Sequence, residues 1–244
     1  MRVFKQIIIV STITFFLALS AKAEKECFEK VSRSIFKFNN ELDRMVIGPI
    51  AKGYNKLPAP IKNGAGNFTS NIGTLLSIPN RLIQKDLTGA ADSLGSFMIN
   101  STFGVLGLAD VASSYGLKDT KEDLSQSLGV YGVKNGCYYV LPVLGPTTLR
   151  DSVAMIGDTY LDPFATMTWR QKEVLSEKGK KSEYLAVKGT TAIDFRGDND
   201  KNIQSLKKNS IDFYAATKSL YLQNKDRKIK NISGATDDNW KDLD

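Results

Sequence analysis

The chain has 244 residues, with 33 lysines and arginines, 26 aspartates and glutamates, two cysteines and no histidine. Its apolar content of 42% and charged content of 24% are close to globular averages, which excludes a wholly disordered chain and a polytopic membrane protein. Without histidine, a Ser-His-Asp or Cys-His catalytic arrangement and any histidine-containing metal site are excluded, and two cysteines are too few for a four-thiolate site. We therefore expect no catalytic residues, no metal site and no cofactor.

The first 23 residues have the pattern of a secretory signal peptide. Arg2 and Lys5 precede an apolar run over residues 7–19, and a small-x-small cleavage site follows at Ala21-Lys22-Ala23. The run is shorter than the ~20 apolar residues of a membrane-spanning helix. Charged residues stand immediately before Cys27, where acylation requires small apolar ones, so we expect export without an evident lipoprotein anchor.

The two cysteines leave two interpretations open. Export permits a disulfide between Cys27 and Cys137. Because it would close a loop of more than a hundred residues, it would stabilise the fold by about 4 kcal/mol in the chain-entropy model. The alternative is two separate thiols, since the sequence alone does not place the Cβ atoms.

The first half of the mature chain has helical periodicity. Residues 28–47 predict an amphipathic helix, because apolar side chains recur at steps of three and four: Phe28, Val31, Ile35, Phe38, Leu42 and Met45. A connector containing Pro58 and Pro60 precedes a weaker helix over 61–72, and the apolar stretch 75–84 is interrupted at Ile78-Pro79. A clearer helix begins at Asp86.

Two glycine-punctuated apolar segments lie in the middle of the chain. Residues 103–111 have almost no polar face, which predicts burial in protein or in lipid. Residues 137–141 have strand-type side chains, so this segment is a strand, half of a hairpin or an extended apolar loop. Thr147 or Thr148 is then expected to cap a helix that runs through Met155.

The last third is more strongly charged. Residues 24–169 carry 14 basic and 14 acidic side chains, whereas residues 170–244 carry 16 basic and 12 acidic ones. Mixed signs are typical of a solvated helical face, so we expect no nucleic-acid binding. A long amphipathic helix is predicted over 202–228, and residues 231–244 are expected to form a flexible polar tail. The fold class is therefore all-α, with one short extended or hairpin element near 136–146.

No group of side chains in the sequence gives a strong indication of catalysis or metal binding. The paired acids Glu122-Asp123 and Asp198/Asp200 are typical of helix starts and loops, and G-x-S-x-G and S-x-x-K are absent. The apolar segments 94–111 and 129–145 are consistent either with a tightly packed core or with a surface that handles something apolar, such as a lipid.

Ordered sequence blocks over residues 28–228 resemble the MlaA (VacJ) family. The N-terminal blocks are Ile35-Phe36-Lys37-Phe38-Asn39-Asn40-Glu41-Leu42-Asp43, Pro58-x-Pro60-x-x-Asn63-Gly64-x-x-Asn67-Phe68-x-x-Asn71, Asn80-x-Leu82-x-Gln84-x-Asp86 and Phe97-x-x-Asn100-Ser101-Thr102-x-Gly104. Those that follow include Glu122-Asp123-Leu124-x-Gln126-x-Leu128-Gly129-x-Tyr131-Gly132, Tyr139-x-Leu141-Pro142-x-Leu144-Gly145-Pro146-x-x-x-Arg150-Asp151 and Ser210-x-Asp212-x-Tyr214.

The resemblance implies a lipid-transport domain over residues 24–230, built as a ring of helices in the inner leaflet of the Gram-negative outer membrane, on its periplasmic face. Such a protein removes mislocalised phospholipid from the outer leaflet through an amphipathic channel. It associates with a trimeric porin and passes the lipid to a soluble periplasmic carrier of the MlaC type. A periplasmic porin-associated scaffold, or a lipid-binding module without transport, is the alternative. An enzyme acting on envelope lipid is a more distant one.

The resemblance also suggests where lipid passes. The residues expected along the path are Phe36, Phe38, Asn39, Tyr138, Tyr139, Leu141, Pro142, Val143 and Leu144. The chain has Gly136-Cys137-Tyr138 where the family usually has Gly-Pro-Tyr. We therefore expect a Cys27–Cys137 disulfide, if formed, to pin the N-terminal helix to the loop beside the channel.

Overall fold

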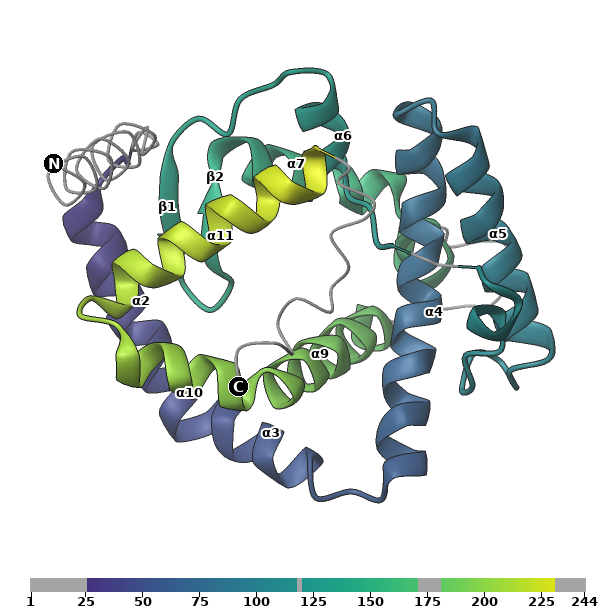
Figure 1. Ribbon diagram of the computed structural model, residues 1–244, viewed down its shortest axis with the longest axis horizontal. Coiled ribbons are helices and arrows are strands. Elements are labelled where there is room, and N and C mark those ends of the chain that lie inside the picture. The colour runs from purple at the N-terminus through teal and green to yellow at the C-terminus, as the bar shows by residue number, and fades with distance from the viewer. Residues whose placement is uncertain (1–25, 118–119, 171–180, 231–244) are drawn as a thin grey trace, which may run out of the picture.

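The computed structural model describes residues 26–117, 120–170 and 181–230. Helices make up most of this part of the chain, and they follow one another around a ring, with one β-hairpin set into its edge (Figure 1). The predicted all-α class with a short hairpin is confirmed. The expected signal peptide, cleavage site and polar tail lie outside the described residues.

The ring begins with the segment predicted as one amphipathic helix. Helix α2 covers Glu29–Leu42, a π-helical turn covers Asp43–Ile47, and α3 covers Gly48–Tyr54. The wide turn ends two residues before Pro49, which lacks a backbone N–H to donate to the preceding turn. Arg196 donates to both carboxylate oxygens of Asp43, at 2.7 and 3.0 Å, and so ties this turn to α9 (Lys181–Asp198).

Helices α4 (Ala59–Ile83) and α5 (Leu87–Thr102) pack along one another at the edge of the ring (Figure 1). The predicted interruption at Ile78-Pro79 is wrong, because α4 runs through Pro79 without a break. Polar side chains on its inner face, Ser77, Asn80 and Arg81, are buried and hydrogen-bonded to neighbouring segments, which holds the helix together at the proline. The predicted start of α5 is confirmed, since the Asp86 side chain accepts from Gly89 N.

The hairpin lies opposite α4 and α5 in the ring. A 3-10 turn (Ala112–Tyr115) and α6 (Leu124–Val130) lead to β1 (Tyr138–Leu141), which pairs antiparallel with β2 (Gly145–Thr148). Thr148 caps α7 (Leu149–Leu161) by accepting from Asp151 N, as predicted, and this helix runs six residues beyond the expected end at Met155. Helix α8 (Pro163–Ala165) and a π-turn (Thr166–Arg170) follow.

Helices α10 (Asp200–Asn209) and α11 (Phe213–Ile229) return the chain to its beginning. One helix over 202–228 was predicted, but the chain breaks after Asn209, because Asp212 caps a new helix by accepting from Ala215 N. The same carboxylate forms an ion pair with Arg33 at 2.8 Å, which joins α11 to α2.

A small aromatic core stands between α2, β1 and α11. Tyr138, Val140 and Tyr214 are buried, and partly buried side chains of α2 and α11 pack against them: Ile35, Phe36, Tyr221 and Leu222. The ring of Phe36 lies 5.3 Å from those of Phe213 and Tyr214. Within the described residues, no helix is long and apolar enough to cross a membrane.

Candidate functional site

The turn of the β-hairpin is held by one side chain of α2. Asn39 Nδ2 donates to the carbonyl of Leu141, and Val143 N donates to Asn39 Oδ1, both at 2.8 Å. Val143 adopts a left-handed backbone conformation (φ 67°), which is unfavourable for a β-branched residue. The two hydrogen bonds, one donated and one accepted by Asn39, fix this conformation, so Asn39 positions the turn.

The predicted path residues separate into two groups. Tyr138 is fully buried (0% exposed), and Phe36 is half-buried against the aromatic core. Both side chains have a structural role in this core, and their place on a lipid path stays a prediction. Tyr139 is half-buried and donates its hydroxyl to Ser152 Oγ at 2.7 Å.

The other group surrounds the turn. Val143 (63%) and Leu144 (65%) are exposed at its tip beside exposed Pro142, and Phe38 is exposed on α2. Leu141 is half-buried at the end of β1. The structure thus brings six of the predicted residues together around the hairpin turn, which we call the hairpin corner: Phe38, Asn39, Leu141, Pro142, Val143 and Leu144. Its tip is apolar and exposed, and the Asn39 side chain holds the turn by two hydrogen bonds.

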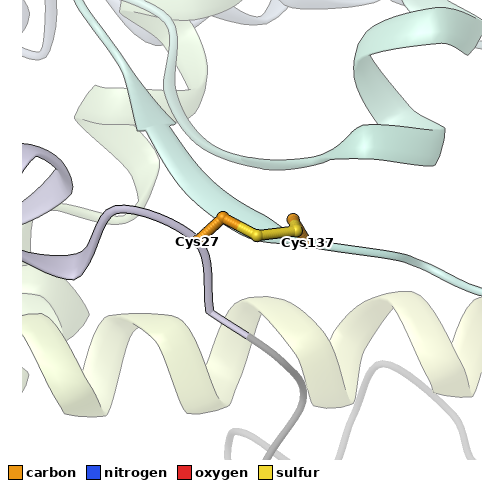
Figure 2. Close-up of a disulfide and its surroundings, with 2 residues drawn as sticks. All are labelled: Cys27 and Cys137. Atoms are coloured by element: carbon orange, nitrogen blue, oxygen red, sulfur yellow. A yellow bond between two sulfur atoms is a disulfide. The ribbon is translucent and has the colours of Figure 1, made fainter.

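A disulfide joins Cys27 to Cys137, directly before β1, with 5.4 Å between the Cα atoms (Figure 2). Cys27 N also donates to the carbonyl of Tyr138 at 3.2 Å. Glu26 forms an ion pair with Lys218 of α11 at 2.6 Å. The start of α2, the hairpin and α11 are therefore tied together at a single point.

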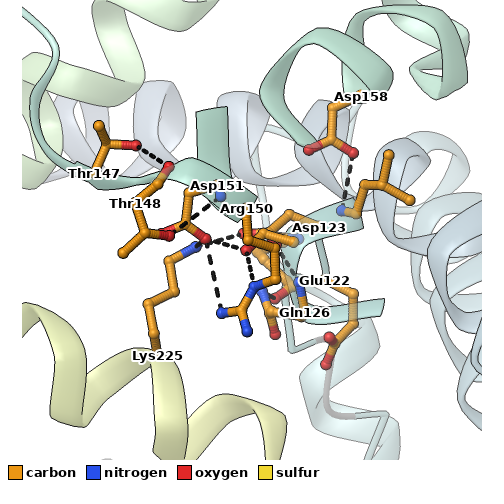
Figure 3. A network of polar contacts seen from close by, with 12 residues as sticks. Glu122, Asp123, Gln126, Thr147, Thr148, Arg150, Asp151, Asp158 and Lys225 are labelled. Atoms are coloured by element: carbon orange, nitrogen blue, oxygen red, sulfur yellow. Dashed lines mark hydrogen bonds and ion pairs between the residues drawn. The ribbon is translucent and has the colours of Figure 1, made fainter. Parts of the chain in front are cut away.

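A buried polar network lies where α6, α7 and α11 meet (Figure 3). The carboxylate of Asp151 accepts hydrogen bonds from Thr148, Ser125 and Tyr221, and Lys225 Nζ lies 3.4 Å away. Burial raises the pKa of this carboxyl, but Lys225 and the three hydroxyls outweigh burial, so the pKa lies below its ordinary value. Asp151 is a charged anchor that orders three helices.

A second carboxylate in the same region behaves differently. Asp158 accepts from Leu124 N at 3.0 Å and from Asn80 Nδ2 at 3.3 Å. Burial raises its pKa to about 6, since these hydrogen bonds only partly offset the cost of desolvation. Asp158 therefore joins α7 to α4 and to the start of α6, and it titrates at mildly acidic pH.

Sequence reasoning missed this network. Arg150 and Asp151 closed one of the motifs quoted above, but no role followed from it. Arg150 Nη1 donates to the carbonyl of Val133 at 2.9 Å, and its Nε donates to Ser125 Oγ at 3.2 Å. The available signal was a capping Thr148 followed by adjacent opposite charges, a pattern that also fits an ordinary exposed helix start.

Side-chain placement is inverted relative to a water-soluble globular protein. Most of the fully buried side chains are polar, including Ser77, Asn80, Ser127 and Thr148. Large apolar side chains are instead exposed on many elements, for example Leu94, Met98, Phe103, Leu106, Val153 and Ile156. Extended apolar surface of this kind is typical of proteins that contact membranes or apolar partners. Within the described residues, no group of acidic or cysteine side chains is arranged to hold a metal ion.

The fold and its surface define a ring of helices with one hairpin, in which many buried side chains are polar and many exposed ones are apolar. Residues 24–228 match the family model described as MlaA lipoprotein. A Haemophilus influenzae protein named intermembrane phospholipid transport system lipoprotein MlaA is 33% identical over 84% of this chain and 80% of its own length. The chain belongs to the MlaA family.

Other relatives agree with this membership. A solved structure described as the structural basis for maintenance of bacterial outer membrane lipid asymmetry is 28% identical, with a TM-score of 0.72 over 84% of this chain and 100% of its own. An uncharacterized protein of Rickettsia typhi is 37% identical over 54% of this chain, and the match spans about half (53%) of that protein. Because the matching family is described as lipoproteins, the expectation of a chain without a lipid anchor finds no support among the relatives.

Proposed function

We propose that this protein removes mislocalised phospholipid from the outer leaflet of the Gram-negative outer membrane and delivers it toward the periplasm, which maintains lipid asymmetry. The observation that carries the proposal is a ring of helices with extensive exposed apolar surface and mostly polar buried side chains. Exposed apolar side chains of α5, α7 and the loop after α5 offer surface to acyl chains, whereas the buried side chains that pack the helices together are mostly polar. Non-covalent transfer requires no catalytic residue.

In this proposal the hairpin corner lies beside the lipid path. Apolar contacts to the lipid come from four exposed side chains: Phe38, Pro142, Val143 and Leu144. Asn39 holds the turn in position through its hydrogen bonds. The protein sits in the inner leaflet at the periplasmic face, beside a trimeric porin, and a soluble carrier of the MlaC type accepts the lipid. Membership in the MlaA family, with a relative named as an intermembrane phospholipid transport lipoprotein, supports phospholipid as the transported molecule.

The decisive experiment is deletion of the gene, followed by measurement of outer-leaflet phospholipid and detergent sensitivity. We expect both to rise in the deletion strain and to return to normal with the wild-type chain. A Leu144→Asp variant should restore them poorly, because a charge at the tip is costly to desolvate beside acyl chains. Ser219→Asp, on the exposed face of α11, is the charge-matched control. Unchanged surface lipid in the deletion strain overturns the proposal.

Purification from the envelope separates transport from scaffolding. The transport proposal expects the tagged chain to carry both phospholipid and a porin. Porin without phospholipid supports a scaffold instead.

A further inference from the structure

A polar cavity of about 90 Å³ lies between α4, α5 and the segment that follows α5. Its wall includes Asn71, Thr74, Ser96, Asp110, Ser113 and Lys121, with Leu117 as its apolar member. Since a single water needs ~10–15 Å³ of such space, the cavity has room for a small polar molecule. In Figure 1, α5 lies on the outer side of α4, away from the hairpin corner.

Two buried atoms of this wall have unmet hydrogen-bonding capacity. Asn71 (4% exposed) donates its Nδ2 to Ser101 Oγ at 3.0 Å, but its Oδ1 has no partner among the described residues. Ser96 Oγ (2% exposed) likewise has none within the described ranges. Leaving a buried polar group unsatisfied costs roughly 1–3 kcal/mol, so each atom gains from a guest in the cavity. The Asn71 oxygen specifically requires a donor.

The wall also carries one charge of each sign. Lys121 Nζ donates to Thr74 Oγ1 at 2.6 Å. Asp110 accepts from Ser113 N at 3.3 Å and from Asn100 Nδ2 at 3.1 Å. Burial raises the pKa of the Asp110 carboxyl, but hydrogen bonds from Ser113 and Asn100, together with the positive charge of Lys121, outweigh it, so Asp110 is ionised at neutral pH. A guest with a single charge faces repulsion from one side, whereas a zwitterion is attracted at both.

The surroundings of the cavity are apolar and exposed. The loop after α5, which also supplies Asp110 to the wall, exposes Phe103 (76%), Leu106 and Leu108. A molecule with a charged head and an apolar tail therefore meets complementary surface both inside and beside the cavity.

We propose that this cavity binds a zwitterionic group that joins a phosphate to a primary ammonium, as in phosphoethanolamine, either free or as a lipid headgroup. The phosphate pairs with Lys121 and the wall hydroxyls. The ammonium donates to Asn71 Oδ1 and to the Asp110 carboxylate. The site lies apart from the hairpin corner and does not depend on transport, so its failure leaves the proposed function standing.

Binding is tested on the full detergent-purified chain by isothermal titration, with phosphoethanolamine, inorganic phosphate and ethanolamine as separate probes. We expect phosphoethanolamine to bind at least tenfold more tightly than either half alone. Asp110→Asn should weaken phosphoethanolamine binding about tenfold and leave inorganic phosphate binding unchanged, and Lys121→Gln should weaken both. Asp92→Asn and Lys85→Gln remove the same charges outside the cavity and serve as matched controls.

The wild-type comparison holds even if a variant fails to fold. Equal affinity for phosphoethanolamine and phosphate, or no saturable binding, overturns the proposal and leaves a cavity filled by water. Competition between the phosphoethanolamine probe and lipid nanodiscs shows whether the natural ligand is a lipid headgroup or a soluble molecule. If phosphatidylethanolamine discs displace the probe and phosphatidylglycerol discs do not, the guest is a lipid head. If neither does, the guest is a soluble molecule of the same chemistry.

Discussion

Asn39 provides both side-chain hydrogen bonds that join α2 to the hairpin turn. Replacing it with alanine leaves the Leu141 carbonyl and the Val143 amide without these partners. We expect Asn39→Ala to lower the free energy of unfolding by about 1–2 kcal/mol. The Val143 amide should also exchange faster in hydrogen–deuterium exchange. Asn40→Ala, one position along the same helix, is the control, and unchanged exchange at the turn contradicts the role of Asn39.

Asp158 makes the free energy of unfolding depend on pH, and comparison with a variant separates this dependence from that of the other ionisable groups. Its pKa is about 6 in the folded protein and near its ordinary 3.8 when unfolded, so the folded state binds more protons between these values. The stabilisation that the protonated Asp158 carboxyl provides is complete below pH ~4 and is lost as the pH rises through about 6. After allowance for solvent screening, we expect the wild type to lose roughly 1 kcal/mol relative to Asp158→Asn over this range.

Urea unfolding of both proteins at intervals from pH 4 to pH 7 checks this expectation. Because Asp151 has a lowered pKa, it acts in the opposite direction, and its contribution is lost as pH falls below about 4. The comparison with Asp158→Asn removes that common effect. A stability difference that is constant with pH shows that Asp158 does not titrate as described.

At the scale of elements, the disulfide is the covalent tie between the start of α2 and the hairpin. The two cysteines are 110 residues apart, so the chain-entropy model gives up to about 4 kcal/mol of stabilisation. We expect the double variant Cys27→Ser/Cys137→Ser to lose most of this stability in urea unfolding, and reduced wild type to match it. A reducing agent should leave the double variant unchanged. Mass mapping that finds both thiols free removes the basis of the prediction.

The elements also show what the sequence did and did not predict. Apolar periodicity and Asp86 correctly located α2 and the start of α5, because capping and amphipathic faces are local signals. Helix α4 was broken into pieces in the prediction because its buried stripe is polar: Asn71, Thr74, Ser77 and Asn80 recur every three residues. A search for apolar periodicity follows the wrong face of such a helix.

The candidate site was predictable only in part, because some of its features are local in the sequence and others join distant segments. Local strand and turn residues indicated a short extended or hairpin element, and the apolar tip of the hairpin consists of Pro142, Val143 and Leu144. Contacts between distant segments, such as Asn39 with Leu141 or Lys225 with Asp151, depend on ring closure. A single sequence contains no direct record of these pairings.

For the whole molecule, exposed apolar surface should determine membrane attachment. Leu94 and Met98 are neighbours one turn apart on the outside of α5. Burying such side chains is worth ~1.5–3 kcal/mol each, so we expect Leu94→Asp/Met98→Asp to reduce binding to phospholipid vesicles by tenfold or more. Ser219→Asp/Gln223→Asp places the same charges at the same spacing on α11. Equal vesicle flotation of the two double variants contradicts an attachment role for α5.

The aromatic core draws on the first and the last described helices, since Phe36 comes from α2, Tyr138 from β1 and Tyr214 from α11. Synthesis proceeds from the N-terminus, so α2 and the hairpin exist long before α11 is made. Until then their apolar side chains lack the partners that bury them. We therefore expect a chain that terminates before Tyr214 to leave this core open, because α11 is the last helix of the described residues to be synthesised and supplies the covering side chains.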